Sequence, residues 1–183
     1  MLTGLPPSTP KIGQARIIDL WCGNNNVYIL NNLLQSQGFD LNNIMHPNLQ
    51  QGSSCGYIAA RAAASLHASN DWYHADIMPD ITSSSLIPLY NSILGLASNH
   101  PTFLTDDQIL MILHHIAGNR QGVPWLQGLV PVNYFTRTLQ RRVGRKAHHG
   151  KLFITIVNTT PLSGPMTNHP VGDHWICVAY QIV

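Results

Sequence analysis

Charge is scarce in this chain of 183 residues: Lys, Arg, Asp and Glu make up 10% of it, against about 25% in a typical domain. The net charge of +2 requires neither a strongly acidic nor a strongly basic partner. No apolar run approaches the ~20 residues that span a bilayer, and the first residues do not resemble a signal peptide. We expect no membrane partner and a single domain over 1–183, with 1–13 as an arm or connector.

Cysteine is also scarce, and the three cysteines have no Cys-x-x-Cys spacing. They are Cys22, Cys55 and Cys177. This pattern argues against a disulfide framework or a structural zinc site and favours a reducing compartment, cytoplasmic or nuclear, or a host cytosol for a secreted effector. The histidines include adjacent pairs at 114–115 and 148–149, whereas a helix binds zinc through the i, i+4 spacing. We expect no metal and no other cofactor.

Apolar spacing divides the rest of the chain into helices and three strands. The strands are predicted over 15–20, 151–158 and 174–183. Helices are predicted from the recurrence of apolar residues over 24–38, 55–66, 83–98, 104–118 and 133–144. The fourth helix begins with a capping box, Thr105 and Gln108. These elements indicate an α+β fold.

Two short segments contain the residue types of nucleophilic catalysis: QQGSSCG at 50–56 and DHW at 173–175. Cys55 heads a predicted helix that Gly-Ser-Ser caps, and a helix N-terminus favours the thiolate form of a cysteine. Gln50 or Gln51 is a candidate donor to an oxyanion, together with the backbone N–H of Cys55. His174 is a candidate base that holds the thiolate as an ion pair and protonates the leaving amine. The alternatives are a small core cysteine and a packing histidine, and we interpret Cys22 and Cys177 as structural.

QQGSSCGYIAARAA resembles the active-site segment of the ubiquitin-like-protein proteases, the superfamily of SUMO-deconjugating and adenoviral cysteine proteases. That segment runs Pro-Gln-Gln, a short turn, Asp-Cys-Gly and a helix. Here Ser54 replaces the aspartate, and the turn is two residues shorter. The pair His174-Trp175 resembles the family's His-Trp strand, KLFITIVN the strand before it, and FLTDDQILMIL the family's first helix.

These matching segments occur in the family's cyclic order but not in its linear order along the chain. The family order is His, Asp, Gln, Cys, whereas the His-Trp strand comes last here, and RIIDLWCGNNNVYILNNLL at 16–34 resembles the segment that should follow it. Moving 100–183 to the front restores the order. The resemblance therefore implies a circularly permuted papain-like cysteine protease fold of the SUMO-protease type, with a central mixed sheet flanked by helices. It predicts that the first strand lies beside the last.

On this reading Asp19 orients His174 from the neighbouring strand. The alternative for Asp19 is a strand-end aspartate that caps the following turn. Asp173 is a poorer candidate because residues adjacent on a strand point to opposite faces. Asn158 and Asn168 are more distant choices.

The resemblance implies a thiol protease or isopeptidase that cleaves after the C-terminal Gly-Gly of ubiquitin or a ubiquitin-like modifier, the expected partner of a monomer. Cys55, His174 and Asp19 form the triad, and Gln51 is favoured over Gln50 for the oxyanion. The resemblance also places three residues against the substrate: Gln50, Gly56 and Trp175. Trp175 would cover a narrow tunnel that accepts a Gly-Gly C-terminus and favours glycines, or is instead a core residue.

Other functions stay open at this point. The same triad serves acyltransferases and polyprotein-processing proteases, and an inactive module would bind ubiquitin-like proteins without cleaving them. The segment 137–151 carries six Lys and Arg residues and suggests nucleic-acid binding. A solvated helix face explains that segment better, so we expect no nucleic-acid partner.

Overall fold

The computed structural model describes residues 11–23, 25–69, 76–117, 125–129, 132–159 and 174–183. Within this part six strands form one mixed sheet: β1 (Gly13–Asp19), β2 (Phe39–Leu41), β3 (Ile44–Met45), β4 (Trp125–Leu129), β5 (Leu152–Asn158) and β6 (Trp175–Ile182). The order is β2-β1-β6-β5-β4. The first half of β1 pairs with β2, and the end of β1 pairs with β3. The central strand β6 is antiparallel to both neighbours, whereas β1–β2 and β4–β5 are parallel pairs.

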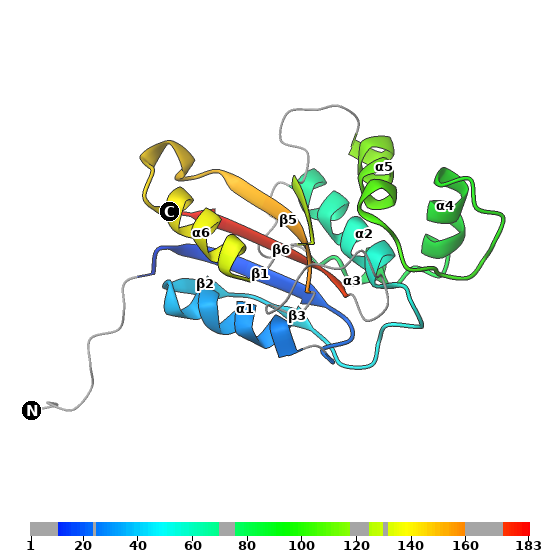
Figure 1. Cartoon of the computed structure of the whole chain (residues 1–183), viewed down its shortest axis with the longest axis horizontal. Helices are drawn as coiled ribbons and strands as arrows, with labels where there is room; N and C mark the ends of the chain where they lie inside the picture. Colours follow the sequence, from blue (N-terminus) through cyan, green and yellow to red (C-terminus); the bar gives the residue numbers. More distant parts are fainter. Residues whose placement is uncertain (1–10, 24, 70–75, 118–124, 130–131, 160–173) are drawn as a thin grey trace, which may run out of the picture.

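Helices cover both faces of this sheet (Figure 1). They are α1 (Asn25–Ser36), α2 (Cys55–Ala68), α3 (Met78–Ile81), α4 (Leu86–Ile93), α5 (Asp106–Ala117) and α6 (Val132–Val143), with a short 3-10 helix η1 (Lys146–His148). Successive residues of β6 enter two separate cores, as the alternation of a strand requires. Trp175, Cys177 and Ala179 pack with α2–α5, whereas Ile176 and Val178 pack with α1 and α6.

The central helix α2 is buried on nearly every side, and its composition explains how it fits. Ten of its 14 residues are buried, and five of these ten are alanines. Alanine combines high helix propensity with a small side chain, so the helix approaches both the sheet and α5 closely. Gly56 continues this close packing, because a Cβ added there would lie 3.1 Å from the Leu104 side chain. The first turn of α2 is thereby fixed next to the sheet.

The α+β class predicted from the sequence is confirmed, and so is the pairing of the first strand with the last. Ala15 faces Tyr180 and Ile18 faces Cys177 in an antiparallel ladder. The predicted arm over 1–13 is too long, because Ile12 bonds to Gly38 and to Val183 and because Gly13 begins β1. The capping box is confirmed by both of its hydrogen bonds between Thr105 and Gln108.

The differences from the predicted elements have local causes. The sequence analysis missed three strands, β2, β3 and β4, and the short helix α3. β2, β3 and α3 have three, two and four residues, and periodicity is not detectable over so few positions. The helix predicted over 83–98 ends earlier, at Ile93, since Gly95 adopts a positive φ of 74°. Over the described residues, no helix combines the length and apolar character that crossing a membrane requires.

Candidate functional site

The antiparallel pairing of β1 and β6 brings the end of one strand beside the start of the other, and with them Asp19 and His174. The His174 Nε2 and Asp19 Oδ1 atoms are 2.7 Å apart, although 155 residues separate the two along the chain. Both side chains are buried, with 3% and 2% of their residue surface exposed. The predicted position of Asp19 behind His174 is confirmed.

Asp19 also fulfils its alternative role at the turn after β1. Its Oδ1 accepts the backbone N–H of Trp21 and its Oδ2 that of Cys22, each at 3.1 Å. Cys22 adopts a positive φ of 55°, which turns the chain toward α1. The two backbone bonds and the histidine hold the carboxylate in one orientation, so the turn and the site depend on the same side chain.

This turn places an aromatic residue that the sequence reasoning missed. The Trp21 ring meets the His174 ring edge-on, with centroids 5.0 Å apart, and 41% of Trp21 is exposed. Gly23 makes room for the indole, since a Cβ there would lie 2.5 Å from it. Trp21 therefore forms the solvent side of the buried histidine. The available signal was the position of Trp21, two residues after the candidate acid.

The backbone of His174 is fixed from the opposite side, by the end of β5. The His174 carbonyl accepts hydrogen bonds from the N–H of Thr159 at 2.8 Å and from its hydroxyl at 3.1 Å. Asn26 at the start of α1 donates in turn to the Thr159 carbonyl. The position of His174 is thus determined by β1 through its ring and by β5 through its backbone.

Cys55 lies at the first position of α2, which packs on β6, and is 3% exposed. Burial disfavours the charged form of His174, but its hydrogen bonds with Asp19 and Cys55 and the charges of both partners raise the pKa of His174 to about 9. Asp19 occupies Nε2, so Nδ1 is the ring atom left for Cys55. Ser54 occupies the N-cap position without a side-chain capping bond, contrary to the capping predicted for Gly-Ser-Ser.

The other two cysteines have environments that keep them protonated. Burial, followed by the charge of Asp19 and a hydrogen bond with it, raises the pKa of Cys22 to about 11. Burial raises the pKa of Cys177 to about 12. These settings fit the interpretation of both as structural residues. Among the described residues, no cluster of three His, Cys, Asp or Glu side chains could hold a metal ion.

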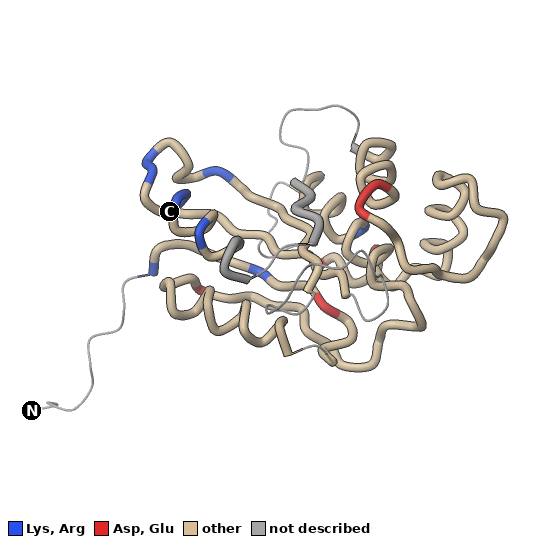
Figure 2. The backbone as a smooth tube through the Cα atoms, viewed as in Figure 1, with Lys and Arg blue, Asp and Glu red and all other residues tan. Residues whose placement is uncertain are grey.

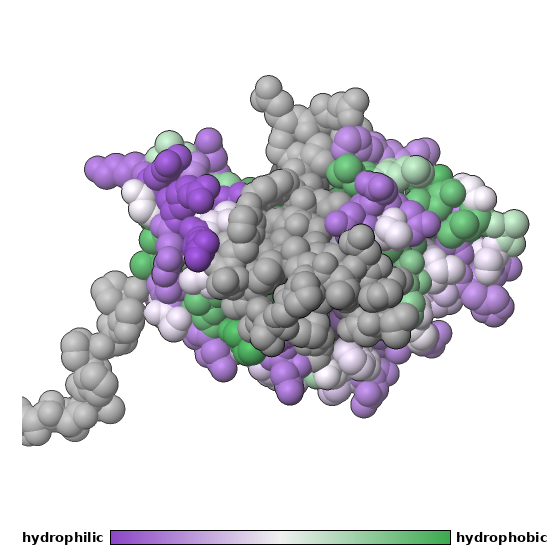
Figure 3. Space-filling model, viewed as in Figure 1, coloured by the Kyte–Doolittle hydropathy of each residue, from purple (hydrophilic) through white to green (hydrophobic). Residues whose placement is uncertain are grey.

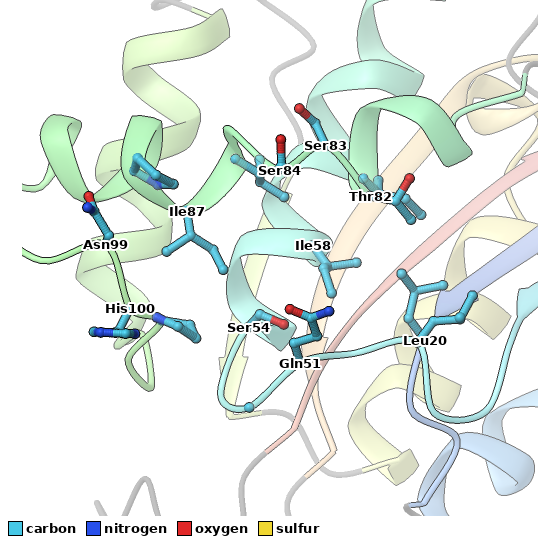
Figure 4. A pocket seen from close by; sticks show the side chains of 16 residues that line it. Leu20, Gln51, Ser54, Ile58, Thr82, Ser83, Ser84, Ile87, Asn99 and His100 are labelled. Atoms are coloured by element: carbon cyan, nitrogen blue, oxygen red, sulfur yellow. The ribbon is translucent and has the colours of Figure 1, made fainter.

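The two glutamines before Cys55 differ in orientation. The Gln50 side chain folds back on its own turn, where Nε2 donates to the Gly52 carbonyl at 2.9 Å. Its Oε1 is buried without a hydrogen-bond partner among the described residues. Gln51 is exposed, lines a cavity, and points from the turn toward Ser54 (Figure 4). Which of them serves an oxyanion stays a prediction.

Two of the residues predicted to touch substrate lie in the core. Gly56 packs against Leu104, and the Trp175 indole N–H donates to the Leu104 carbonyl at 3.0 Å. Trp175 is only 4% exposed. This position matches the core alternative for Trp175, and the geometry gives its tunnel role no support. Asp173 and Asn168, considered as other partners for His174, fall outside the described residues.

The basic segment lies away from this site. Arg142 stacks over the Phe153 ring at 4.1 Å and bonds to the Tyr180 hydroxyl. Five other cations of the segment are exposed: Arg137, Arg141, Arg145, Lys146 and Lys151. Figure 2 shows the blue positions of α6, η1 and the start of β5 at the end of the sheet where β6 finishes.

Together these contacts define a buried Cys-His-Asp constellation at one end of the central strand of an α+β fold. The chain matches no family model, no curated protein and no solved structure. The site is therefore interpreted from its own geometry.

Proposed function

We propose that the protein is a thiol peptidase or isopeptidase with Cys55 as its nucleophile. The observation that carries the proposal is the position of His174, which is hydrogen-bonded through Nε2 to the buried Asp19 and lies near enough to Cys55, at the first position of α2, for that thiol to help raise the pKa of His174. A nucleophile, a base and a residue that orients the base, in hydrogen-bond reach of one another, are the requirements of covalent acyl transfer.

In the first half of the reaction the Cys55 sulfur attacks the carbonyl carbon of the scissile bond. His174 holds the thiol proton and delivers it to the leaving nitrogen as the C–N bond breaks, which leaves a thioester. Asp19 stabilises the imidazolium and fixes its orientation. A water molecule then attacks the thioester and gives its proton to His174; the released acid and the free thiol complete the cycle. The Cys55 N–H and the Gln51 amide are the proposed oxyanion donors.

The proposals on fold, oligomeric state, substrate and localisation follow from the resemblance to the ubiquitin-like-protein proteases. The fold is a circularly permuted papain-like one, and the chain acts as a monomer on ubiquitin or a ubiquitin-like modifier, after its Gly-Gly end. A reducing compartment, cytoplasmic or nuclear, or a host cytosol suits a thiol nucleophile. Trp21 takes the place that the resemblance assigns to Trp175, because the Trp21 ring contacts the His174 ring and is partly exposed.

Probes made of ubiquitin-like proteins with a cysteine-reactive C-terminal group test this proposal. At least one probe should attach to the wild-type protein and to Cys22→Ala, and none to Cys55→Ala. The attachment site is read by mass spectrometry. If no probe attaches and no peptide is cleaved, the peptidase proposal fails. Stable acetylation of Cys55 by acetyl-CoA would point to an acyltransferase instead.

A further inference from the structure

Five exposed cations lie at the end of the sheet where β6 finishes, and Figure 2 shows their positions in blue on α6, around η1 and before β5. Among the described residues, none of the five forms an ion pair with an acidic side chain. Asp40, at the same end of the sheet, lies on β2, two strands away from β6. These cations define the basic end of the molecule: Arg137, Arg141, Arg145, Lys146 and Lys151.

The helix that carries two of these cations is fixed against the sheet by its opposite face. Phe135 and Leu139 of α6 are buried in the core that contains Ile176 and Val178. Because Arg137 and Arg141 are four residues apart, they lie on one exposed face, separated by about 6 Å along the helix axis. The two guanidinium groups therefore form a charged ridge whose backbone is already in place before any partner binds.

Hydrogen bonds fix the other cations relative to this ridge. The Gly150 N–H donates to the Ile182 carbonyl at 2.6 Å, and Gln181 Nε2 donates to the Gly150 carbonyl at 2.7 Å. His149 Nε2 lies 3.0 Å from the Val143 carbonyl at the end of α6. The segment from η1 to β5 is thereby tied to both β6 and α6, so the cations of the two segments belong to one surface.

A histidine within this surface shows that its positive charge is not neutralised. Burial, followed by Arg142, Arg145, Lys151 and His149, lowers the pKa of His148. No acidic side chain is among the described groups that act on this ring. The Nδ1 atom of His148 is buried without a hydrogen-bond partner among the described residues. Charges of one sign that gather without counter-charges produce a positive potential, which attracts an anionic partner.

The spacing and the surroundings of the cations favour an acidic polypeptide over a nucleic acid. An extended peptide presents every second side chain on the same side, about 6.6 Å apart, which is close to the spacing of Arg137 and Arg141. Arginine pairs with a carboxylate through two parallel hydrogen bonds. Single-stranded nucleic acids stack their bases on aromatic rings. Of the two described rings beside Arg142, Phe153 is covered by its guanidinium and Tyr180 is 1% exposed.

We propose that the basic end binds an acidic segment of another polypeptide, extended across α6 and η1 with alternate Asp or Glu side chains against the cations. Tyr180, at this end of β6, lies six residues, about 20 Å, from His174. The bound segment is therefore a partner held apart from Cys55 rather than a substrate. The inference goes beyond the proposed peptidase activity and does not depend on it.

Fluorescence anisotropy with labelled ligands and the full chain tests the class of partner. A Glu-Ser repeat of about 12 residues should bind at low salt, whereas the Gln-Ser repeat should bind at least 20-fold more weakly. Affinity for the acidic repeat should fall about tenfold between roughly 50 and 200 mM salt, because salt screens exposed charges. Equal affinity for the two repeats would overturn the proposal. Tighter binding of a DNA single strand or duplex with the same number of charges would assign the basic end to nucleic acid instead.

Paired substitutions locate the binding to the basic end. Arg137→Gln with Arg141→Gln should lower affinity for the acidic repeat about tenfold, while Lys at both positions should keep it within about threefold. The matched control is Ser84→Asp with Ser92→Asp, at exposed positions beside and within α4, on the opposite side of the molecule from α6 (Figure 1). It changes the net charge by the same amount and should leave the affinity within about twofold. Equal losses in the two double variants would show attraction by net charge alone and overturn the surface.

Amide NMR separates this surface from the candidate active site. The acidic repeat should shift the backbone signals of Arg141, Lys146 and Lys151, and leave the indole N–H signal of Trp21 beside His174 unchanged. A shift of the Trp21 signal without any change in α6 and η1 would place the peptide at the candidate active site and overturn the proposal. Shifts confined to the basic end would support it whether or not Cys55 is a nucleophile.

Discussion

Two histidines near opposite ends of the central strand have opposite pKa shifts. Asp19 and Cys55 outweigh burial and raise the pKa of His174 to about 9. His148 in η1 packs edge-on against Phe153 of β5. Phe153 pairs with Tyr180 of β6, and Tyr180 lies six residues, about 20 Å, along the chain from His174. Burial and then Arg142, Arg145, Lys151 and His149 lower the pKa of His148. The fold, through the charges it gathers around each ring, decides which histidine can act as an acid.

This difference is rooted in how charge is distributed along the chain. Seven of the ten Lys and Arg residues, and none of the eight acidic ones, fall within 108–172. The structure folds most of that basic stretch to one end of the sheet, and Figure 3 shows a hydrophilic surface over it. Figure 3 shows apolar patches toward α4 and α5, where Leu89, Leu110 and Met111 are exposed. The basic end holds exposed cations, whereas the other end of β6 holds a buried ion pair.

The largest effect should follow from removing the histidine itself. His174→Gln should lower turnover, or the rate of probe labelling, by about 10⁴-fold or more, because His174 is the proposed base, bonded to Asp19 and with a pKa that Cys55 helps to raise. His149→Gln at the basic end is the matched control and should keep wild-type activity. Comparable losses in the two variants would mean that the effect is not local to the site.

Replacing the acid should come next in size. Asp19→Asn should lower kcat about 10³–10⁴-fold, since the amide neither stabilises the imidazolium nor fixes its tautomer. Asp40→Asn, exposed on β2, controls for the loss of one carboxylate. If Asp173→Asn instead caused the larger loss, Asp19 would be only a turn cap.

Titration of both histidines by NMR tests the comparison itself. His174 should titrate near pH 9 and His148 below 6.5. In Asp19→Asn the pKa of His174 should fall, because burial remains while the bond and charge of Asp19 are lost. Activity of wild type should decline as the pH rises through about 9, where His174 loses the proton it gives to the leaving group. Equal pKa values for His174 and His148 would contradict the proposed difference between the two ends of β6.

The raised pKa of His174 also makes stability depend on pH. A folded-state pKa above the unfolded value contributes stability that is fully present below pH 6.5 and is lost as the pH rises through about 9. Urea unfolding of wild type between pH 6.5 and 10 should therefore show a decline that Asp19→Asn lacks. A decline of equal size in the variant would assign the effect to other groups.

The smallest effects on activity belong to the basic end. Arg142→Gln should reduce the free energy of unfolding by about 1–3 kcal/mol, because it removes the stack on Phe153 and the bond to Tyr180. Turnover per folded molecule should not change. Arg145→Gln, at an exposed position, should change stability by less than about 0.5 kcal/mol. A loss of turnover in Arg142→Gln would show that the two ends of β6 are coupled.

The parts of the fold that the sequence predicted are those with long, regular patterns. The helices around Cys55 and after Thr105 were recognisable from alanine content and from a capping box. The pairing of β1 with β6, and with it the position of Asp19, was predictable only from the cyclic order of several landmarks. No local pattern relates two residues 155 positions apart.

The parts that were missed depend on contacts between distant residues. Trp175 and Trp21 are alike in the sequence, each next to or near a candidate catalytic residue. Trp175 is buried because it packs against Leu104. Trp21 lies at the surface beside His174 because the chain turns at Cys22 and Gly23. The cavity was likewise unpredictable, since its walls come from four separate segments.

Alkylation of the three cysteines in a single sample tests the central claim most directly. The wild-type protein is treated at pH 6.5 with a limiting amount of iodoacetamide, and each cysteine is followed by mass spectrometry. Accessibility alone favours Cys22, because Cys55 and Cys177 are buried. The account predicts the opposite order, with Cys55 modified first in wild type and its lead lost in His174→Gln. Modification of Cys22 ahead of Cys55 would contradict a nucleophile activated by His174 and Asp19.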